Sequence, residues 1–369
     1  MKKILYVTTV SRTINAFLVP HIEMLLDNGY QVDCACNIDK PFSSKLVDRG
    51  VRVFDVPYQR TPFNIKNLKA LKELQKLQIE NQYDMIHVHT PVASFYTRLL
   101  KRKFQNVKMV YTCHGFHFYK GAPLINWALF YPAEKLAATL TDTLITINEE
   151  DYQNALKLGI KANKVFKVHG VGVGELAFTV KESNIREELN LEDSDFIITV
   201  VAELNKNKNH IQIIDAIREI KDEYKNIKVL FVGDGKLIGH LRNTISKYGL
   251  EDNIHILGFR NDVPDIIKHS DVIGLFSKRE GLPRCLMEGM MCGKPLITSN
   301  NRGTRELVIS NKNGYLLKND DVNMTNKAII NLYKNKENII CMGEKSRELV
   351  QKYTLKNVLN QLTEIYQSI

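Results

Sequence analysis

Short apolar runs alternate with amphipathic segments along the chain, and this alternation predicts parallel β-sheets covered by helices. Residues 3–10 and 31–37 are apolar enough for buried strands, and residues 51–57 form a third such run. Between strands, residues 17–28 predict a helix that Gly29 ends. A further helix is predicted where apolar residues recur every three positions, at Ile65, Leu68, Leu71, Leu74 and Leu77.

The second half of the chain repeats this scheme. Apolar strands are predicted at residues 196–204, 228–235 and 272–277, with helices at 210–224 and 237–250 between them. Strands that are separated by helices are typical of parallel sheets with helices on both faces. The sequence therefore predicts an α/β protein of two Rossmann-like, doubly wound domains.

A length of 369 residues also favours two domains over one. Glycines cluster at residues 170–184, where the periodicity breaks. We therefore expect a first domain over residues 1–172 and a second over 173–351. A C-terminal helix at about residues 352–369 is expected to pack back on the first domain.

Polar segments follow five of the predicted strands, and four of these segments contain glycine or proline. They are residues 87–91, 112–118, 202–210, 257–264 and 277–289. In open parallel sheets, ligands bind at the carboxyl ends of the strands. We therefore expect these segments to form the functional surface.

The last of these segments contains two carboxylates, Glu280 and Glu288, on either side of Pro283. Proline favours the first turn of a helix, so a helix is predicted to begin there. Free amides at a helix start bind anions such as phosphate, and a carboxylate one turn further can accept hydrogen bonds from a ribose diol. The alternative is structural: Glu280 caps the helix and Glu288 is solvated.

Residues 280–297 (EGLPRCLMEGMMCGKPLI) resemble the Glu-x7-Glu signature of retaining glycosyltransferases of family 4. Residues 257–283 resemble the segment that leads into this signature, and residues 313–317 the segment that follows it. Residues 112–119 and 202–210 are similar to bacterial capsule, O-antigen and exopolysaccharide members. The resemblance implies a GT-B fold, in which two Rossmann-like domains face each other across a cleft.

The resemblance also implies a catalytic set of Glu280, His114 and Lys208. Glu280 and His114 match positions beside the donor sugar, and Lys208 matches a phosphate-binding lysine. Such a cation stabilises the charge of a diphosphate leaving group.

The resemblance further implies a nucleotide-sugar-binding set, in which Glu288 holds the ribose and Arg260 lies near the base. This set comprises Lys208, Glu288, Arg260, Gly281, Leu282, Pro283, Glu203 and Asn205. Glu203 departs from the family, which usually has an arginine there, so Lys206 and Arg12 are alternative second cations. The loop after the first strand lacks the family's paired glycines, which leaves Ser11, Arg12 and Thr13 as contacts for the donor or acceptor.

No cofactor and no obligatory metal are expected. His87 and His89 alternate along a strand without a carboxylate or cysteine at metal-ligand spacing. We expect His89 to line the cleft and His87 to pack. The glycines at 170–174 lack the order of a dinucleotide-binding motif.

The net charge of +10 is concentrated in the first half of the chain. Residues 1–170 contain 23 Lys and Arg against 14 Asp and Glu, an excess of nine. This asymmetry indicates an acidic partner such as an anionic membrane, a nucleic acid or a phosphorylated substrate, or it serves solubility alone. The chain has no run of 18 consecutive apolar residues, so no transmembrane helix is predicted.

Two segments of the first half are candidates for contact with the acceptor or a membrane. The first segment, residues 98–104, is basic, and the alternative interpretation is a solvated helix face. The second segment, residues 116–132, is aromatic, and the alternative interpretation is part of the core. The candidate residues are Arg98, Lys101, Arg102, Lys103, His117, Tyr119, Lys120 and Trp127.

The predicted function is that of a cytoplasmic retaining glycosyltransferase, peripheral at the inner face of the plasma membrane. It would move an N-acetylated or deoxy hexose from a UDP-sugar to a polyprenyl-diphosphate-linked acceptor of a bacterial capsule or surface polysaccharide, without binding nucleic acid. One alternative is a non-hydrolysing UDP-sugar 2-epimerase, whose dense set of acids and histidines is not evident. Another is a non-catalytic sugar-nucleotide-binding subunit, against which Glu280, Glu288 and Lys208 argue.

Overall fold

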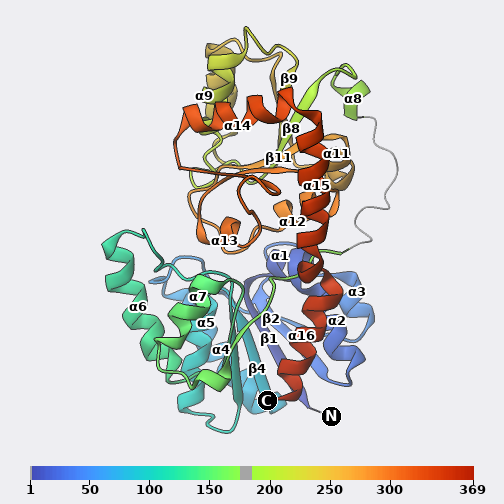
Figure 1. The fold of residues 1–369 in the computed structure, drawn as a ribbon. Coiled ribbons are helices and arrows are strands. Elements are labelled where there is room, and N and C mark those ends of the chain that lie inside the picture. Colours follow the sequence, from blue (N-terminus) through green and yellow to red (C-terminus); the bar gives the residue numbers. More distant parts are fainter. Residues whose placement is uncertain (1, 175–184) are drawn as a thin grey trace. The chain divides into compact units, whose positions relative to one another are not determined.

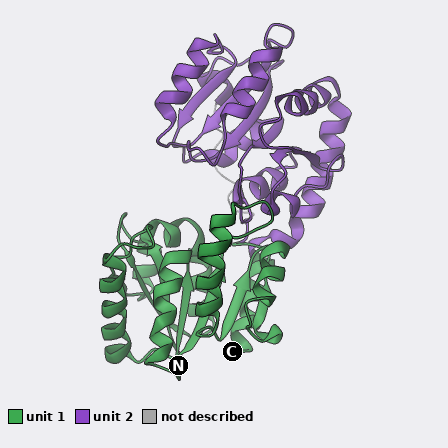
Figure 2. Cartoon of the chain, turned by 90° about the vertical axis from the view of Figure 1, so that its left-hand side faces the viewer, with its two compact units in different colours: residues 1–171, 356–369 green, residues 172–355 purple. Residues whose placement is uncertain are grey.

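The chain forms two compact units in the computed structural model, which describes residues 2–174 and 185–369. Unit 1 contains residues 1–171 and 356–369, and unit 2 contains residues 172–355 (Figure 2). The sequence had placed these divisions at residues 172–173 and at about residue 352. Most of the predicted seam, residues 175–184, lies outside the described residues.

Unit 1 is built on a sheet of seven parallel strands in the order β3-β2-β1-β4-β5-β6-β7. Leu5 pairs with Ile86 across β1 and β4, and both side chains are fully buried, as in a sheet covered on both faces. The strands are β1 Lys3–Val10, β2 Gln31–Asn37, β3 Val53–Asp55, β4 Met85–His89, β5 Lys108–Cys113, β6 Thr143–Thr146 and β7 Val165–Lys167.

Helices cover both faces of this sheet (Figure 1). On one face, Leu5 and Val7 share a core with Leu74, while on the other His87 hydrogen-bonds Tyr366. The helical segments of unit 1 are α1 Ser11–Thr13, η1 Ile14–Leu18, α2 Val19–Asp27, α3 Ser44–Asp48, α4 Lys66–Asn81, α5 Pro91–Arg98, η2 Leu99–Arg102, α6 Leu124–Ala138, α7 Glu149–Leu156, η3 Ala162–Lys164 and α16 Leu355–Gln367.

Unit 2 is built on six parallel strands in the order β10-β9-β8-β11-β12-β13. The order reverses between β8 and β11, and ligands bind open α/β sheets at such a switch point. The strands are β8 Phe196–Val201, β9 Ile227–Val232, β10 Ile254–Gly258, β11 Val272–Leu275, β12 Leu296–Ser299 and β13 Gly314–Leu317.

Alternate residues of β8 point into different cores of unit 2. Ile198 packs with Ile213 and Ile329 on one face of the sheet, whereas Ile197 packs with Ile266 on the other. The helical segments of unit 2 are α8 Ile185–Glu188, α9 Ile211–Ile220, α10 Ile238–Lys247, α11 Val263–His269, α12 Arg284–Met291, α13 Arg302–Arg305, α14 Val322–Lys334, α15 Lys336–Val350 and η5 Gln351–Tyr353.

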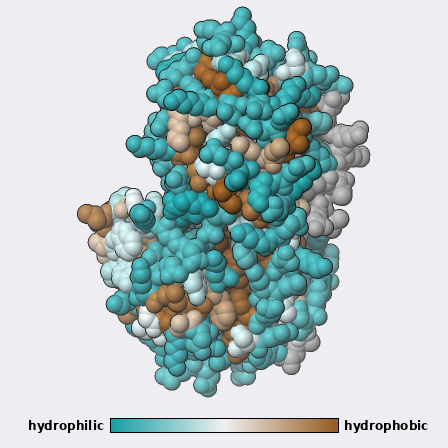
Figure 3. Space-filling model, in the orientation of Figure 1, coloured by the Kyte–Doolittle hydropathy of each residue, from teal (hydrophilic) through white to brown (hydrophobic). Residues whose placement is uncertain are grey.

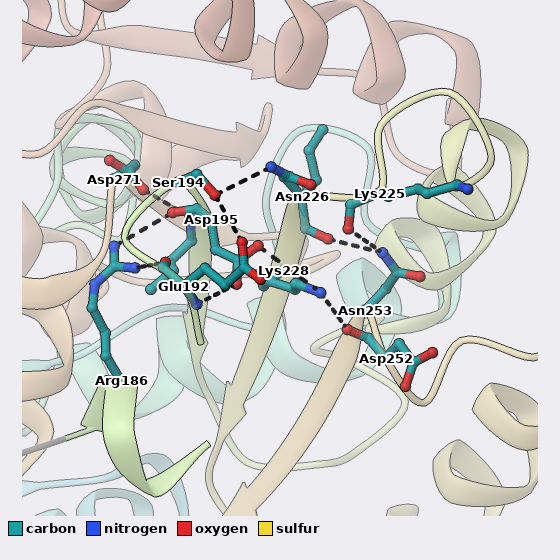
Figure 4. A network of polar contacts seen from close by, with 12 residues as sticks. Arg186, Glu192, Ser194, Asp195, Lys225, Asn226, Lys228, Asp252, Asn253 and Asp271 are labelled. Carbon is teal, nitrogen blue, oxygen red and sulfur yellow. Dashed lines mark hydrogen bonds and ion pairs between the residues drawn. The ribbon is translucent and has the colours of Figure 1, made fainter. Parts of the chain in front are cut away.

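Hydrogen bonds from polar side chains link the amino ends of neighbouring strands in unit 2 (Figure 4). The Ile197 amide donates to Asp271 Oδ2 over 2.7 Å, and Asn253 Nδ2 donates to the Ile227 carbonyl over 3.1 Å. These bonds fix strand register at the edge opposite to the one where ligands bind. The carboxyl edge is therefore held in place from the far side of the sheet.

Two predicted elements differ from the observed ones in extent. The helix predicted over residues 17–28 begins earlier, at α1 Ser11–Thr13, and continues through a π-helical turn at Ile14–Leu18 into α2. The strand predicted over residues 51–57 is shorter, Val53–Asp55, since it pairs with a single neighbour at the sheet edge. The prediction of two parallel α/β sheets is confirmed.

Gly289 allows α12 to pack closely on β11. A Cβ on this glycine would come within 2.6 Å of Ile273 Cγ1, closer than packed carbon atoms approach. Gly239 in α10 is a matched contrast, because its Cβ would meet no atom within 4 Å.

We expect Gly289→Ala to lower the free energy of unfolding by about 1–3 kcal/mol through overpacking. Gly239→Ala should instead raise it by up to about 1 kcal/mol, since alanine favours helices. Urea unfolding followed by far-ultraviolet circular dichroism measures both. Equal midpoints for the two variants would contradict this account of α12.

Candidate functional site

Two loops meet at the carboxyl edge of the unit 2 sheet because they follow neighbouring strands, β8 and β11. Asn207 Nδ2 donates to the Arg279 carbonyl over 3.0 Å, and the Lys278 amide donates to the Asn207 carbonyl over 2.8 Å. These hydrogen bonds bring together two segments that lie about seventy residues apart in the chain.

Lys208 and Glu280 form an ion pair between these loops, with Nζ 2.6 Å from Oε1. Both side chains are mostly buried, at 20% and 13% exposure. Burial acts to lower the pKa of Lys208, but the charge and hydrogen bond of Glu280 outweigh it, so the pKa is raised. Lys208 therefore remains a cation, as an anion-binding site requires.

The backbone around Glu280 is fixed by the loop that follows β12. Arg302 is buried, and its Nε donates to the Glu280 carbonyl over 3.1 Å. Gly303 packs so closely that a Cβ on it would lie 2.5 Å from the Gly281 carbonyl oxygen. Arg302 and Gly303 were not among the predicted residues, although they lie shortly after β12, at the same carboxyl edge.

Helix α12 begins directly after the Glu280 loop, with Pro283 as its N-cap residue and without a side-chain hydrogen bond at the cap. Glu280 bonds Lys208, so the structural alternative in which Glu280 caps the helix is not what the structure shows. The first amides of α12 lie at the positive end of the helix dipole, which favours an anion.

Glu288 lies one turn into α12 and forms an ion pair with Arg284, with Oε1 2.9 Å from Nε. Its side chain is 17% exposed, so the alternative of a solvated carboxylate is wrong as well. Burial raises the pKa of Glu288, and the charge of Arg284 offsets this only in part. Arg284 was not predicted, but its spacing of four residues on a predicted helix was a usable signal.

Arg260 lies in the loop after β10 and is held by two carboxylates. Its guanidinium contacts Glu188 over 2.6 and 2.9 Å and Asp262 over 2.8 and 2.7 Å. Hydrogen bonds to Asp262 and Glu188 raise the pKa of Arg260 further. The predicted contact of Arg260 with a base stays a prediction. That Glu188 and Asp262 bind this guanidinium was not predicted from the sequence.

Asn205 shapes the turn that presents Lys208. Its Oδ1 accepts hydrogen bonds from the amides of Asn207 and Lys208, over 3.0 and 3.1 Å. Glu203 is exposed, and its charge also favours the charged form of Lys208. Neither observation tests whether Asn205 and Glu203 contact a nucleotide sugar.

His114 belongs to unit 1, at the end of β5, and shares a hydrogen bond of 3.0 Å with His89. The ring of His89 also lies against that of His87 in a tilted contact, with ring centroids 4.3 Å apart. Burial lowers the pKa of His114 to about 4 and holds those of His87 and His89 well below the usual value. These imidazoles are neutral near pH 7, and His114 can act there only as a hydrogen-bonding group.

Arg98 corrects the predicted basic cluster, because this side chain is only 1% exposed. Its Nη2 contacts Glu134 Oε2 over 2.7 Å, and its guanidinium stacks 4.4 Å above the ring of Tyr111. Arg98 is a buried, paired cation and cannot contact a membrane surface. The reading of this segment as a uniformly solvated helix face is wrong for Arg98 for the same reason.

The remaining candidates for the acceptor or membrane divide by exposure. Lys101 is paired with Asp142 over 2.6 Å, whereas Arg102, Lys103 and Lys120 are exposed. In the aromatic segment, Trp127 packs against the unit 1 core, and its Nε1 donates to the Tyr119 carbonyl. His117 stacks on Phe130 with ring centroids 4.5 Å apart.

No group of three or more His, Cys, Asp or Glu side chains within residues 2–174 and 185–369 is arranged to hold a metal ion. No helix in the described part of the chain is both long and apolar enough to cross a membrane.

Comparisons with protein families match both units. Residues 3–148 match the family described as "Glycosyl transferase 4-like", and residues 181–353 match "Glycosyl transferases group 1".

Two relatives extend this similarity over almost the whole chain. The chain is 35% identical over 373 residues to EpsD of Bacillus subtilis (strain 168), which is named as a glycosyltransferase; the match covers 99% of this chain and 96% of EpsD. It is 28% identical to the UDP-Gal:alpha-D-GlcNAc-diphosphoundecaprenol alpha-1,3-galactosyltransferase of Escherichia coli, over 93% of this chain and 90% of that enzyme.

Solved structures resemble the chain over its full length. Anabaena HepE in complex with UDP and glucose has a TM-score of 0.83 at 18% identity, with full coverage of both chains. Sucrose-phosphate synthase from Thermosynechococcus elongatus has a TM-score of 0.83 at 17% identity, covering 100% of this chain and 99% of that one. These likenesses confirm the predicted GT-B fold of two Rossmann-like domains.

The buried imidazoles of unit 1 predict that acid destabilises this unit. Burial lowers the pKa values of His21 and His114 to about 4, below the usual value of about 6.5. Their contribution to stability is therefore complete above pH 6.5 and is lost as the pH falls towards 4. Each such histidine should lower the free energy of unfolding by up to about 1.4 kcal/mol per pH unit in this range.

Urea unfolding at pH 7 and pH 5 checks this prediction through the fluorescence of Trp127, the only tryptophan of the chain. His21→Gln should reduce the loss of stability at pH 5. His269→Gln, an exposed site in unit 2, should leave it unchanged. Equal stability of the wild type at both pH values would show that the imidazoles are not buried as described.

Proposed function

Because the chain belongs to the family of group 1 glycosyltransferases, we propose that it transfers a sugar from a UDP-sugar to a polyprenyl-diphosphate-linked acceptor. The product would be an intermediate of a bacterial capsule or other surface polysaccharide. We propose further that the sugar is an N-acetylated or deoxy hexose and that its anomeric configuration is retained.

The ion pair of Lys208 and Glu280 beside the start of α12 is the observation on which this proposal depends. It places a cation, the first amides of α12 and a carboxylate at the carboxyl edge of one sheet. A nucleotide sugar offers matching groups: an anionic diphosphate for the cation and amides, and sugar hydroxyls for the carboxylate. Glu288, further along α12, would accept hydrogen bonds from the ribose.

Catalysis in this proposal comes mainly from stabilising the leaving group. As the bond between the sugar and UDP breaks, negative charge grows on the diphosphate. Lys208 Nζ and the amides at the start of α12 would balance that charge in a site already oriented for it. Neutral His114 would hydrogen-bond the sugar and would not act as a cation.

The names of relatives support the choice of donor and acceptor. The E. coli relative is named for a UDP-galactose donor and a diphosphoundecaprenol acceptor. A Campylobacter jejuni relative, 22% identical over 384 residues, is also named for a diphospho-undecaprenol substrate. To reach a lipid-linked acceptor, the protein would associate peripherally with the inner face of the plasma membrane. The excess of nine positive charges in residues 1–170 suits an anionic surface.

Product analysis tests this function against its two alternatives. The protein is incubated with a panel of UDP-sugars and with N-acetylglucosamine-diphosphoundecaprenol, and the lipid and nucleotide fractions are analysed by mass spectrometry. Extension of the lipid-linked sugar supports the proposal. An epimerised nucleotide sugar would identify a 2-epimerase, and binding without turnover would identify a non-catalytic subunit.

We expect Lys208→Ala to weaken UDP binding and to slow transfer. Loss of one charge-assisted contact to the leaving group should raise the activation barrier by about 2–4 kcal/mol. Lys278→Ala is the matched control, because Lys278 lies on the Glu280 loop but contacts Asp320, over 3.2 Å. Wild-type turnover of Lys208→Ala, measured as initial rates of transfer, would refute the assignment of Lys208.

We propose that no metal is obligatory, because Lys208 and the α12 amides can balance the diphosphate charge. Transfer should therefore continue at a similar rate in EDTA. A loss of activity that magnesium or manganese restores would show that a cation bridges the diphosphate instead.

A further inference from the structure

Unit 1 contains a cavity of about 610 Å³ at the carboxyl ends of β1, β4 and β5. This volume is within the range of about 300–1,000 Å³ that ligand pockets occupy. Most of its wall is apolar and comes from α5, α6 and the loop after β3. The principal wall residues are Phe63, Phe95, Tyr96, Leu129, Phe130 and Ala133.

One part of the cavity wall is polar. Thr9, Thr13 and Thr90 line it together with Arg60. The hydroxyl oxygens of Thr9 and Thr90 lie 2.6 Å apart. Thr90 has a φ of 66°, which is costly for a β-branched residue and is found mainly where a site requires it.

The charge of the cavity wall is positive. Glu134 also lines the cavity, but Arg98 pairs with it over 2.7 Å and balances its charge. Arg60 is exposed, and none of the hydrogen bonds or ion pairs found among residues 2–174 and 185–369 involves its guanidinium. The cavity therefore combines a long apolar wall with a cation that is available to an anion.

The apolar wall continues to the protein surface. Phe63 is 88% exposed and Leu129 is 51% exposed, although both line the cavity. Leu124 and Ile125 are also exposed at the start of α6, and Ile125 is one turn before Leu129 on the same helix face. Hydrophobic atoms are visible in this part of the surface, at the left edge of Figure 3, where Figure 1 draws the start of α6.

We propose that this cavity binds the isoprenoid segment that adjoins the diphosphate of a polyprenyl-diphosphate-linked acceptor. The apolar wall would hold the first isoprene units, and Arg60 would face the diphosphate, because the Thr90 hydroxyl already donates to the His89 carbonyl. The rest of the chain would leave past Phe63 and Leu129. The inference rests on the proposed function, to which it adds a recognition site for the lipid itself.

The composition of the wall favours this occupant over others. A nucleoside or sugar needs several polar partners, whereas the α5 and α6 walls offer mainly apolar and aromatic groups. A bilayer surface can contact the exposed residues at the mouth of the cavity, but it does not extend into the space behind them. An anionic headgroup joined to a flexible branched hydrocarbon satisfies both the charge and the wall.

Farnesyl diphosphate, a short soluble polyprenyl diphosphate, is the probe for the full chain. Its affinity, measured by isothermal titration calorimetry, should exceed that of inorganic pyrophosphate, which shares only the anion. Leu129→Asp should weaken farnesyl diphosphate binding about tenfold or more, because it places a charge in the apolar wall. Arg60→Gln should weaken the binding of both ligands.

Leu136→Asp is the matched control. Leu136 is on α6 and is 51% exposed, as Leu129 is, but it does not line the cavity. It should bind farnesyl diphosphate as the wild type does. Equal affinity of Leu129→Asp and the wild type, or an equal loss in Leu136→Asp, would overturn the proposal.

Two further measurements separate this inference from the proposed function and from a bilayer contact. If Leu129→Asp extends the lipid-linked acceptor at the wild-type rate, the cavity assignment fails while the proposed function stands. If farnesyl diphosphate binding depends on Leu129 but no lipid-linked acceptor is extended, the cavity assignment stands and the function fails. If Leu129→Asp loses only flotation with phosphatidylglycerol vesicles and keeps farnesyl diphosphate binding, the surface serves the bilayer and the proposal is overturned.

Discussion

The geometry of the candidate donor site depends on the ion pair between Lys208 and Glu280. The two residues are 72 positions apart, and they meet because β8 and β11 are neighbours at the point where the strand order of unit 2 reverses. The same adjacency sets the Asn207 loop against the Arg279 carbonyl and places the start of α12 beside it. Removing one partner of a partly buried ion pair leaves the other charge uncompensated, which costs free energy. Loss of either Lys208 or Glu280 would therefore disturb the loop that carries the other residue.

The ionisable side chains in the interior of unit 1 are either neutral or paired with an opposite charge. His87, His89 and His114 are neutral because burial lowers their pKa values, and Arg98 is balanced by Glu134. The positive excess of this half of the chain must therefore act through exposed cations. Arg60 is an exposed cation that lines an apolar cavity, which is why the cavity suits a ligand with both an anionic and a hydrocarbon part.

The sequence predicted most of the strand positions, because parallel strands buried on both faces are nearly continuous apolar runs. It also predicted the positions of Glu280, Glu288 and Lys208, since a motif with fixed spacing is a local feature. It could not predict that Arg98 is buried, because the partner that permits burial, Glu134, is 36 residues away on another helix. The same limit applies to Arg260: Asp262 was visible beside it, but Glu188 is 72 residues earlier. The cavity was not predicted either, since its walls come from five separate segments of the chain that only the fold brings together.

The two cations of the candidate donor site, Arg260 and Lys208, differ in how many N–H donors their present partners leave for a ligand. Arg260 already uses four of its five N–H donors on Glu188 and Asp262, which leaves one donor at Nη1 for an added anion. Lys208 Nζ has three donor hydrogens, and Glu280 is its only hydrogen-bond partner in the described part of the chain. Lys208 can therefore keep Glu280 in position and still donate to a phosphate oxygen. An arginine fixed by two carboxylates orients its loop, whereas a lysine with one partner can hold the loop and bind the ligand at once. This difference favours Lys208 as the group that responds to charge on a leaving diphosphate.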